Sequence, residues 1–231
     1  MRAGRLGERL AGLVQPQRSA AELAAASLRE AIMLGELLPG ERVAEEDLLR
    51  PLGISRNTLR EAFRLLAHEK LLEHQFNRGV FVRTVDANDV EDLFRVRRLI
   101  EVPALANSTT EDWSTMTEAV QTGLTAATRG EWTEVGTANI RFHQAIVAAA
   151  GSRRLDELMC QLTAELRLAF HGMGDPRTFH ESYLHRNNEI ATLTANGDLA
   201  RATTLLTTYL DDAEREMTTA FRAAGRGCPQ A

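Results

Sequence analysis

The stretch LGISRNTLREAFRLLAHEKLL, which begins at Leu52, constrains the fold of this chain more than any other. Gly53 interrupts a short helical pattern, and the hydroxyl of Ser55 can cap a new helix by accepting a hydrogen bond from a free backbone N–H. The new helix has one apolar stripe at helical spacing, made of Leu59, Ala62, Phe63, Leu66 and Ala67. Its other side carries Arg56, Asn57 and Arg60. This pattern predicts a helix-turn-helix whose second helix enters the DNA major groove. The alternative is an ordinary amphipathic surface helix with a solvated basic side.

The residues before this stretch predict two further helices. Ser19 can cap a helix that runs to about Leu34. A second, shorter helix is expected over about residues 44–49, because Pro51 disfavours helix in the residue before it.

The residues after this stretch predict a wing. In EHQFNRGVFVRTV, side chains alternate around Gly79, which indicates a β-hairpin with residues 77–79 at its tip. Three helices and a hairpin make a winged helix, and the wing places a tip residue beside the phosphates or in the minor groove. Arg78 is the candidate for this contact, and the alternative is a tip arginine without a partner.

Charge divides the chain into two unequal parts. The net charge of all 231 residues is −5, which argues weakly against DNA binding. Residues 1–85 nevertheless hold 13 Lys and Arg against 11 Asp and Glu, whereas residues 86–231 hold 14 against 21. A slightly basic front part and an acidic back part fit a DNA reader joined to a unit that does not touch DNA.

Targeting signals and cysteine spacing are the two sequence features that bear on the expected location of the protein. No apolar run approaches the roughly 20 residues that a membrane span needs, and the basic N-terminal residues lack the apolar core of a secretory signal. Cys160 and Cys228 lie too far apart to suggest a disulfide framework or a metal knuckle. We therefore expect a cytoplasmic protein that does not contact a membrane.

From Asp86 onward the sequence predicts only helices. Asp86 can cap a long helix that Pro103 would kink, and five more helices are expected over about residues 111–129, 131–150, 153–171, 176–195 and 198–223. The expected fold class is therefore mainly α: a winged helix-turn-helix of three helices and a small β-hairpin, followed by an antiparallel bundle of about six helices. The expected parts are a loose arm (1–18), the winged helix (19–85), a helical effector-binding and dimerisation domain (86–223) and a frayed tail (224–231).

Several motifs resemble those of one bacterial family. The turn GELLPGER, the helix entry LGISR, the Arg-Glu-Ala of the second helix and the Arg-Gly of the wing are similar to the winged helix of GntR-family transcription regulators, over about residues 20–85. The motif Asp-Leu-Phe-Arg-Val-Arg-x-x-x-Glu at 92–101, with Phe-His at 142–143 and Asn-Gly-Asp-x-x-x-Ala at 196–202, resembles the all-helical FCD-type effector domain of the FadR subgroup.

The resemblance implies a set of DNA contacts. Arg56 and Arg60 match the arginines with which the family contacts bases or phosphates, and Asn57, in place of a common threonine, can pair with adenine. Arg50 is placed for a phosphate, whereas Glu46 stands where some relatives have a DNA-contacting arginine. The full predicted set is Arg50, Ser55, Arg56, Asn57, Thr58, Arg60, Arg78 and Gly79.

The resemblance also implies a place for a divalent metal, which many family members hold with an Asp or Asn and three histidines. Asn139 and His143 match two of these positions, but Asn187 and Tyr209 stand where the other two histidines are expected. Zinc and nickel prefer imidazole or thiolate to amide and phenol, so no metal is predicted and Asn139 with His143 remains a weak alternative. A shifted register could bring in His185, and the neighbouring loop could instead supply His171 or His180.

A polar pocket without metal is the favoured alternative. Arg97 could receive a carboxylate, and Arg167, within an apolar helix, could also face inward. The predicted effector-binding set is Arg97, Asn139, His143, Arg167, Asn187, Asn188 and Tyr209, which suits a small organic anion. In the competing interpretation Arg97 forms a structural ion pair with Glu101, one turn away, and His143 is a core histidine with its hydrogen bonds satisfied.

Together these patterns predict a regulator and no enzyme. The expected protein is a homodimer that binds an inverted-repeat DNA operator and changes its operator affinity when a small-molecule effector binds, with repression as the common family pattern. The sequence has no nucleophile–base pair, glycine-rich phosphate loop or pair of catalytic carboxylates that would favour an enzyme. The other alternative is a DNA-binding or interaction module whose degenerate pocket has lost its effector.

Overall fold

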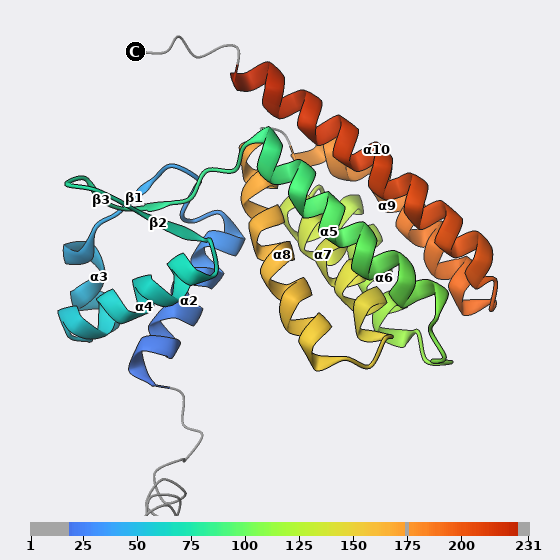
Figure 1. Ribbon diagram of the computed structural model, residues 1–231, viewed down its shortest axis with the longest axis horizontal. Helices are drawn as coiled ribbons and strands as arrows, with labels where there is room; N and C mark the ends of the chain where they lie inside the picture. Colours follow the sequence, from blue (N-terminus) through green and yellow to red (C-terminus); the bar gives the residue numbers. More distant parts are fainter. Residues whose placement is uncertain (1–18, 174–175, 226–231) are drawn as a thin grey trace, which may run out of the picture.

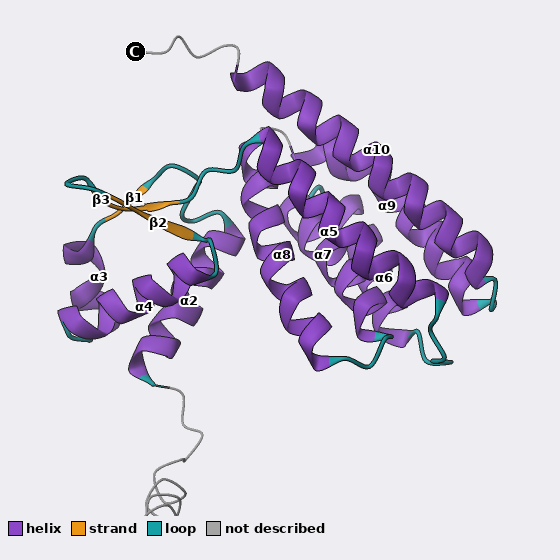
Figure 2. Cartoon of the chain, viewed as in Figure 1, coloured by secondary structure: helices purple, strands orange, loops and turns teal. Residues whose placement is uncertain are grey.

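The computed structural model describes residues 19–173 and 176–225 (Figure 1). The arm expected over residues 1–18 and residues 226–231 of the expected tail lie outside this part of the chain. Within it, a unit of three helices and a small sheet precedes a unit made of helices (Figure 2). The predicted fold class, a winged helix-turn-helix followed by a helical bundle, is therefore confirmed.

Two of the three helices of the first unit begin after a serine whose side chain caps them, Ser19 and Ser55. Ser19 accepts a hydrogen bond from the N–H of Glu22, while the Glu22 carboxylate accepts one from the N–H of Ser19, so the first helix starts with a capping box. The turn of the helix-turn-helix contains Gly53 at φ 62°, a left-handed conformation that glycine adopts without steric cost. The helices are α2 (Ala20–Leu34), α3 (Glu45–Leu52) and α4 (Arg56–His68).

The wing is a three-stranded antiparallel sheet in the order β1-β3-β2. Leu72 pairs with Val82 at its base and Gln75 pairs with Gly79 near its tip, as the predicted hairpin requires. The strands are β1 (Arg42–Val43), β2 (Leu72–Gln75) and β3 (Gly79–Val82). The first of them was not expected, because two residues are too short to show an alternating pattern.

Two details of this unit differ from the expectation. Helix α3 does not stop at residue 49 but continues to Leu52 and includes Pro51. A proline in the last turn removes one N–H from the helix, and the helix ends immediately afterwards at Gly53. Ala67, expected in the apolar stripe of α4, is exposed, whereas Leu59 and Leu66 are fully buried. The last turn of α4 therefore buries Leu66 but leaves Ala67 exposed to solvent.

The second unit is a bundle of helices. Its first helix starts at the predicted cap, where Asp86 accepts hydrogen bonds from the N–H groups of Asn88 and Asp89, and it continues through Pro103 for one more turn. The helices are α5 (Ala87–Ala106), α6 (Ser114–Thr128), α7 (Trp132–Ala148), α8 (Arg153–Gly172), α9 (Pro176–Ala195) and α10 (Leu199–Gly225). The six expected helices are all present, although α6 starts three residues later than expected.

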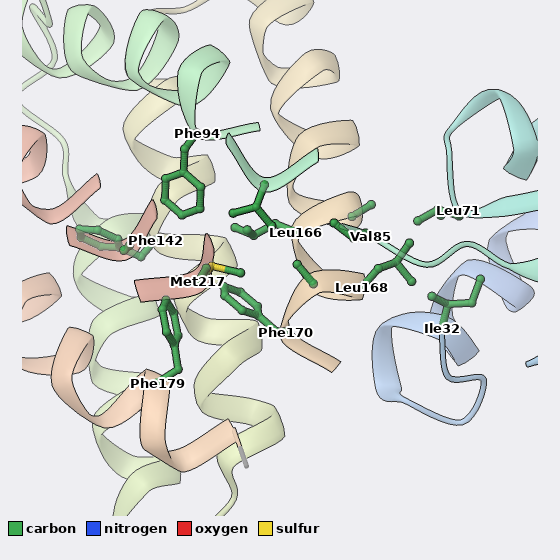
Figure 3. Packing of buried hydrophobic residues seen from close by; sticks show 14 of the residues in the cluster. Ile32, Leu71, Val85, Phe94, Phe142, Leu166, Leu168, Phe170, Phe179 and Met217 are labelled. Carbon is green, nitrogen blue, oxygen red and sulfur yellow. The ribbon is translucent and has the colours of Figure 1, made fainter. Parts of the chain in front are cut away.

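Helix α8 is the bundle helix that lies next to the winged helix (Figure 1). Its residues from Leu162 to Phe170 are buried on every side. In Figure 3, Leu168 points toward Ile32 of the winged helix, whereas Phe170 points into the bundle with Phe179 and Met217. The hydrophobic core is therefore continuous from the winged helix to the bundle.

Charged side chains reinforce this junction. The guanidinium of Arg83, which follows the wing, donates to Glu165 of α8 at 2.9 Å and to Asp89 of α5 at 2.5 Å. Lys70 adds a longer ion pair to Glu165 at 3.7 Å. In the described part of the chain, no helix is both long and apolar enough to span a membrane.

Candidate DNA-binding surface and buried polar cluster

The N-terminus of α4 presents the predicted DNA-reading residues. The Ser55 hydroxyl accepts a hydrogen bond from the N–H of Thr58 at 3.1 Å and lies 2.8 Å from the Thr58 hydroxyl, so both are occupied in capping the helix. Arg56, Asn57 and Arg60 are exposed, while Leu59 is fully buried beneath them. The local sequence thus directs polar groups outward at the end that a recognition helix inserts first.

Arg56, Asn57 and Arg60 line a groove between α4, the start of α3 and the sheet of the wing. Arg42 and Gly79 lie on the sheet side of the groove, and Arg50, exposed at the end of α3, does not line it. The groove is lined on its helical side by Glu45, Glu46, Asp47, Arg56, Asn57, Arg60 and Arg64. On the helical side, three carboxylates therefore face the same space as three arginines. This arrangement could not be predicted from the sequence, because Glu45 and Arg60 lie 15 residues apart.

Arg78, the predicted DNA contact of the wing, is exposed at the wing tip. The guanidinium of Arg78 lies 5.5 Å from the centre of the Phe81 ring, so the exposed tip arginine packs along its own hairpin. Asn77 at φ 59° and Gly79 at φ 108° form the tight turn. Among the described residues, the most exposed large apolar side chain is Phe76 at the same tip, which is 84% exposed.

A chain of hydrogen bonds runs through the interior of the bundle, from α5 through α7 to α9 and α10. The two oxygens of the Glu101 carboxylate are occupied by Arg97 Nε at 2.6 Å and His143 Nδ1 at 2.7 Å. The Tyr209 hydroxyl lies 3.2 Å from His143 Nε2 and 3.0 Å from Asn139 Oδ1, and donates its single proton to one of them at a time. The chain ends with Asn187, whose amide donates to Asn139 Oδ1 at 2.8 Å. We call these six residues the buried polar cluster.

Burial and charge fix the protonation states within the buried polar cluster. Burial alone would raise the pKa of Glu101, but the charge of Arg97 and the hydrogen bond from His143 hold it below its ordinary value. Burial, assisted by Arg97, lowers the pKa of His143, and burial raises the pKa of Tyr209. At neutral pH the cluster therefore contains a Glu101 carboxylate, a neutral His143 that donates from Nδ1, and a protonated phenol.

Comparisons with known proteins match both units. The model of the family described as FCD domain matches residues 92–212, and that of the bacterial regulatory proteins, gntR family, matches residues 20–82. The first match alone covers more than half of the chain. The chain belongs to the GntR family.

Relatives agree with this assignment. The crystal structure of a GntR transcriptional regulator from Rhodococcus sp. RHA1 is 41% identical in sequence, with a TM-score of 0.86 over 88% of this chain and 100% of that chain. The galactonate operon transcriptional repressor of Escherichia coli is 27% identical over 67% of this chain and 80% of its own length. The match to the regulator YdhC of Bacillus subtilis, 29% identical over 57% of this chain, spans 61% of that relative, which is less than two thirds of its length. This GntR-family chain is thus a DNA-binding transcription regulator with an FCD effector domain.

The donor set of this GntR-family chain does not fit the metal that many FCD domains hold. Asn139 Oδ1 already accepts from Asn187, the phenol of Tyr209 keeps its proton, and His143 is the only imidazole in the cluster. The described residues contain no group of three or more His, Cys, Asp or Glu side chains arranged to hold a metal ion. An amide and a protonated phenol are weak ligands for zinc or nickel, so the cluster offers one imidazole as its only preferred ligand.

Two residues of the predicted effector set lie outside the buried polar cluster. Asn188 is exposed, since it follows the buried Asn187 along α9 and points away from the bundle. Arg167 is buried but faces the junction with the winged helix, where it donates to the carbonyl oxygen of Met33 at 2.7 Å and to the carbonyl oxygen of Thr133 at 3.2 Å. The helical pattern correctly predicted that Arg167 is buried, but it could not show which neighbouring element Arg167 meets.

The other histidines also lie away from the cluster. His185 is exposed on α9. The ring of His180 is buried next to Arg167, and burial lowers its pKa to about 4, while His171 contacts the last turn of α2. None of these three histidines therefore lies in the buried polar cluster. Glu101, in contrast, is the centre of the cluster, and its i, i+4 spacing from Arg97 was the sequence signal for it.

Proposed function

We propose that this GntR-family regulator is a cytoplasmic homodimeric repressor that binds an inverted-repeat operator. In each subunit the exposed N-terminal end of α4 would enter the major groove, with Arg56, Asn57 and Arg60 at the bases and Arg50 and Arg78 at phosphates. A relative from Escherichia coli bears the name of a repressor, of the galactonate operon, which supports the sign of regulation.

We further propose that the effector is a small hydroxy acid, and one observation carries this step. Arg97 Nη2 and Asn187 Oδ1 are buried and have no hydrogen-bond partner within the described part of the chain. The first is a charged donor that suits an anionic oxygen, and the second is an acceptor that suits a hydroxyl. A ligand that supplies both removes two buried unsatisfied groups, each of which costs about 1–3 kcal/mol.

The packing offers a route from this effector site to the DNA reader. Asn139 and His143 lie on α7, and the earlier turns of the same helix hold Arg167 through the carbonyl oxygen of Thr133 and the hydroxyl of Thr137. Arg167 in turn donates to the carbonyl oxygen of Met33 at the end of α2. A shift of α7 on effector binding would therefore move a contact that the winged helix shares. Such a shift changes operator affinity only if the effector binds the two arrangements unequally.

A thermal unfolding experiment tests the effector. Full-length protein is heated with lactate or gluconate, and with propionate or hexanoate as acids that lack a hydroxyl. A ligand at about 100 times its Kd stabilises by about 2.7 kcal/mol, which corresponds to roughly 5–10 °C for a protein of this size. The shift should occur with a hydroxy acid, disappear in Asn187→Ala and survive in Asn188→Ala, the matched control on the exposed side of α9.

A second candidate function is effector-independent DNA binding. It is favoured by one observation: Glu101 already supplies a carboxylate to both Arg97 and His143, where an acidic ligand would otherwise bind. If no acid of either kind raises the unfolding temperature, or if the shift is the same in Asn187→Ala, the hydroxy-acid proposal is wrong and this second candidate gains support.

A further inference from the structure

The acidic start of α3 shares a groove with the arginines of the recognition helix. Glu45 is the first residue of α3, but the helix is capped by Ala44, which has no polar side chain. The Glu45 carboxylate reaches across the groove instead. It accepts from Arg60 Nε at 2.9 Å and from Arg60 Nη2 at 3.4 Å.

These two contacts occupy one particular edge of the Arg60 guanidinium. Nε and Nη2 form its side edge, and both face the carboxylate. The end edge, which carries one N–H of Nη1 and one of Nη2, stays free, and the Arg60 side chain is 59% exposed. Two parallel N–H donors are what a bidentate contact to O6 and N7 of guanine requires. Glu45 thus occupies the side edge of the Arg60 guanidinium and leaves the end edge free to contact a base.

From this geometry we infer that Glu45 is a positioning residue for base reading: it orients Arg60 toward a base edge and withholds it from the phosphates. The inference rests on the proposed role of α4 in DNA reading. Arg has several rotatable bonds, so fixing its guanidinium before binding lowers the entropy lost on contact with a base. The carboxylate also repels phosphates, which weakens binding to random sequences.

Glu46 provides a matched control. It is the next residue of α3, lines the same groove and carries the same charge. In the described part of the chain it forms no ion pair with Arg60, whose partner is Glu45. Removing either carboxylate should raise affinity for random DNA by a similar factor. Only the loss of Glu45 should change how Arg60 meets a base.

The experiment begins with full-length wild-type protein and a pool of randomised duplexes, from which an operator is selected. The base pair that Arg60 reads is the one at which Arg60→Ala loses its preference. Fluorescence anisotropy then gives Kd for the operator, for the operator changed at that base pair, and for a random duplex. The proteins compared are the wild type, Glu45→Gln, Glu45→Ala and Glu46→Gln.

The wild type and Glu46→Gln should prefer the correct base pair by roughly tenfold or more, which is the usual range for a bidentate arginine contact. Glu45→Gln and Glu45→Ala should lose most of this preference while binding random DNA more tightly. Because the Arg60–Glu45 pair is partly exposed, all variants should unfold at nearly the same temperature.

Three results would overturn the inference in distinguishable ways. An unchanged base preference in both Glu45 variants would mean that Glu45 acts only as a charge. An Arg60→Ala protein that keeps every base preference would mean that Arg60 reads no base, so that Glu45 has nothing to position. If wild-type protein selects no sequence from the pool, the proposed operator reading fails, and the role of Glu45 fails with it.

Discussion

Replacing Glu101 by glutamine should weaken the bundle more than any other change of a single charge in α5. The Glu101 side chain is 0% exposed and each of its oxygens accepts a hydrogen bond. Glutamine keeps the shape but removes the charge, and its NH₂ group then faces a donor of either Arg97 or His143. The guanidinium of Arg97, 2% exposed, would remain buried without an opposite charge.

The size of the effect follows from this burial. Breaking a buried ion pair by removing one partner costs about 3–5 kcal/mol, or roughly 6–20 °C in unfolding temperature for a chain of this length. The control is Asp92→Asn on the same helix, because Asp92 pairs with Arg95 at 3.3 Å and both side chains are 68% exposed. That change should stay within about 0.5 kcal/mol.

Far-UV circular dichroism during heating measures both variants, and pH provides an independent check. Since the pKa of Glu101 is lowered in the folded protein, its stabilising contribution is complete above the unfolded pKa and is lost as pH falls through the folded pKa. The difference between wild type and Glu101→Gln should therefore shrink in acid. Equal, small effects of Glu101→Gln and Asp92→Asn would refute the view that this carboxylate compensates a buried cation.

Three further predictions concern other parts of the chain. Ser55→Ala removes the cap of α4 and should lower the free energy of unfolding, measured in urea, by about 1 kcal/mol. Ser55→Asp keeps a capping oxygen and should cause no loss of stability. A Cβ at Gly136 would lie 2.6 Å from Arg167 Nη1 and 2.8 Å from His180 Nε2, so Gly136→Ala should destabilise by about 1–3 kcal/mol. The loss should be smaller in Arg167→Ala, where only the close contact with His180 remains. Burial lowers the pKa of His180 to about 4, so between about pH 6.5 and pH 4 the unfolded chain binds a proton that the folded chain does not, and stability should fall as the pH drops through this range. The variant His180→Gln should reduce this pH dependence of stability. An equal slope in both proteins would contradict the prediction.

Much of the fold could be predicted because local signals determine where its elements begin. Ser19, Ser55 and Asp86 cap their helices as expected, and Gly79 marks the hairpin. The strand at residues 42–43 could not be predicted, since its place in the sheet depends only on pairing with β3. The extension of α3 through Pro51 depends on the turn that follows it.

The candidate sites were predictable only in part. Helical periodicity indicates that Arg97, His143 and Arg167 are buried, but not which partners they meet, because contacts between helices depend on how the helices cross. Arg167 therefore belongs to the junction with α2 rather than to the buried polar cluster. For the same reason the pairing of Glu45 with Arg60 across the groove follows from the packing of α3 on α4 alone.

The most direct test of the account compares operator binding by Arg56→Ala with binding by Arg95→Ala. Arg56 lies in the groove at the start of α4, whereas Arg95 is an exposed arginine of α5 outside it. Both variants lose one positive charge, so a purely electrostatic effect would be shared. With the operator that wild-type protein selects, anisotropy should show at least a roughly tenfold loss for Arg56→Ala and wild-type affinity for Arg95→Ala. Equal affinities of the two variants would contradict the claim that α4 reads the operator.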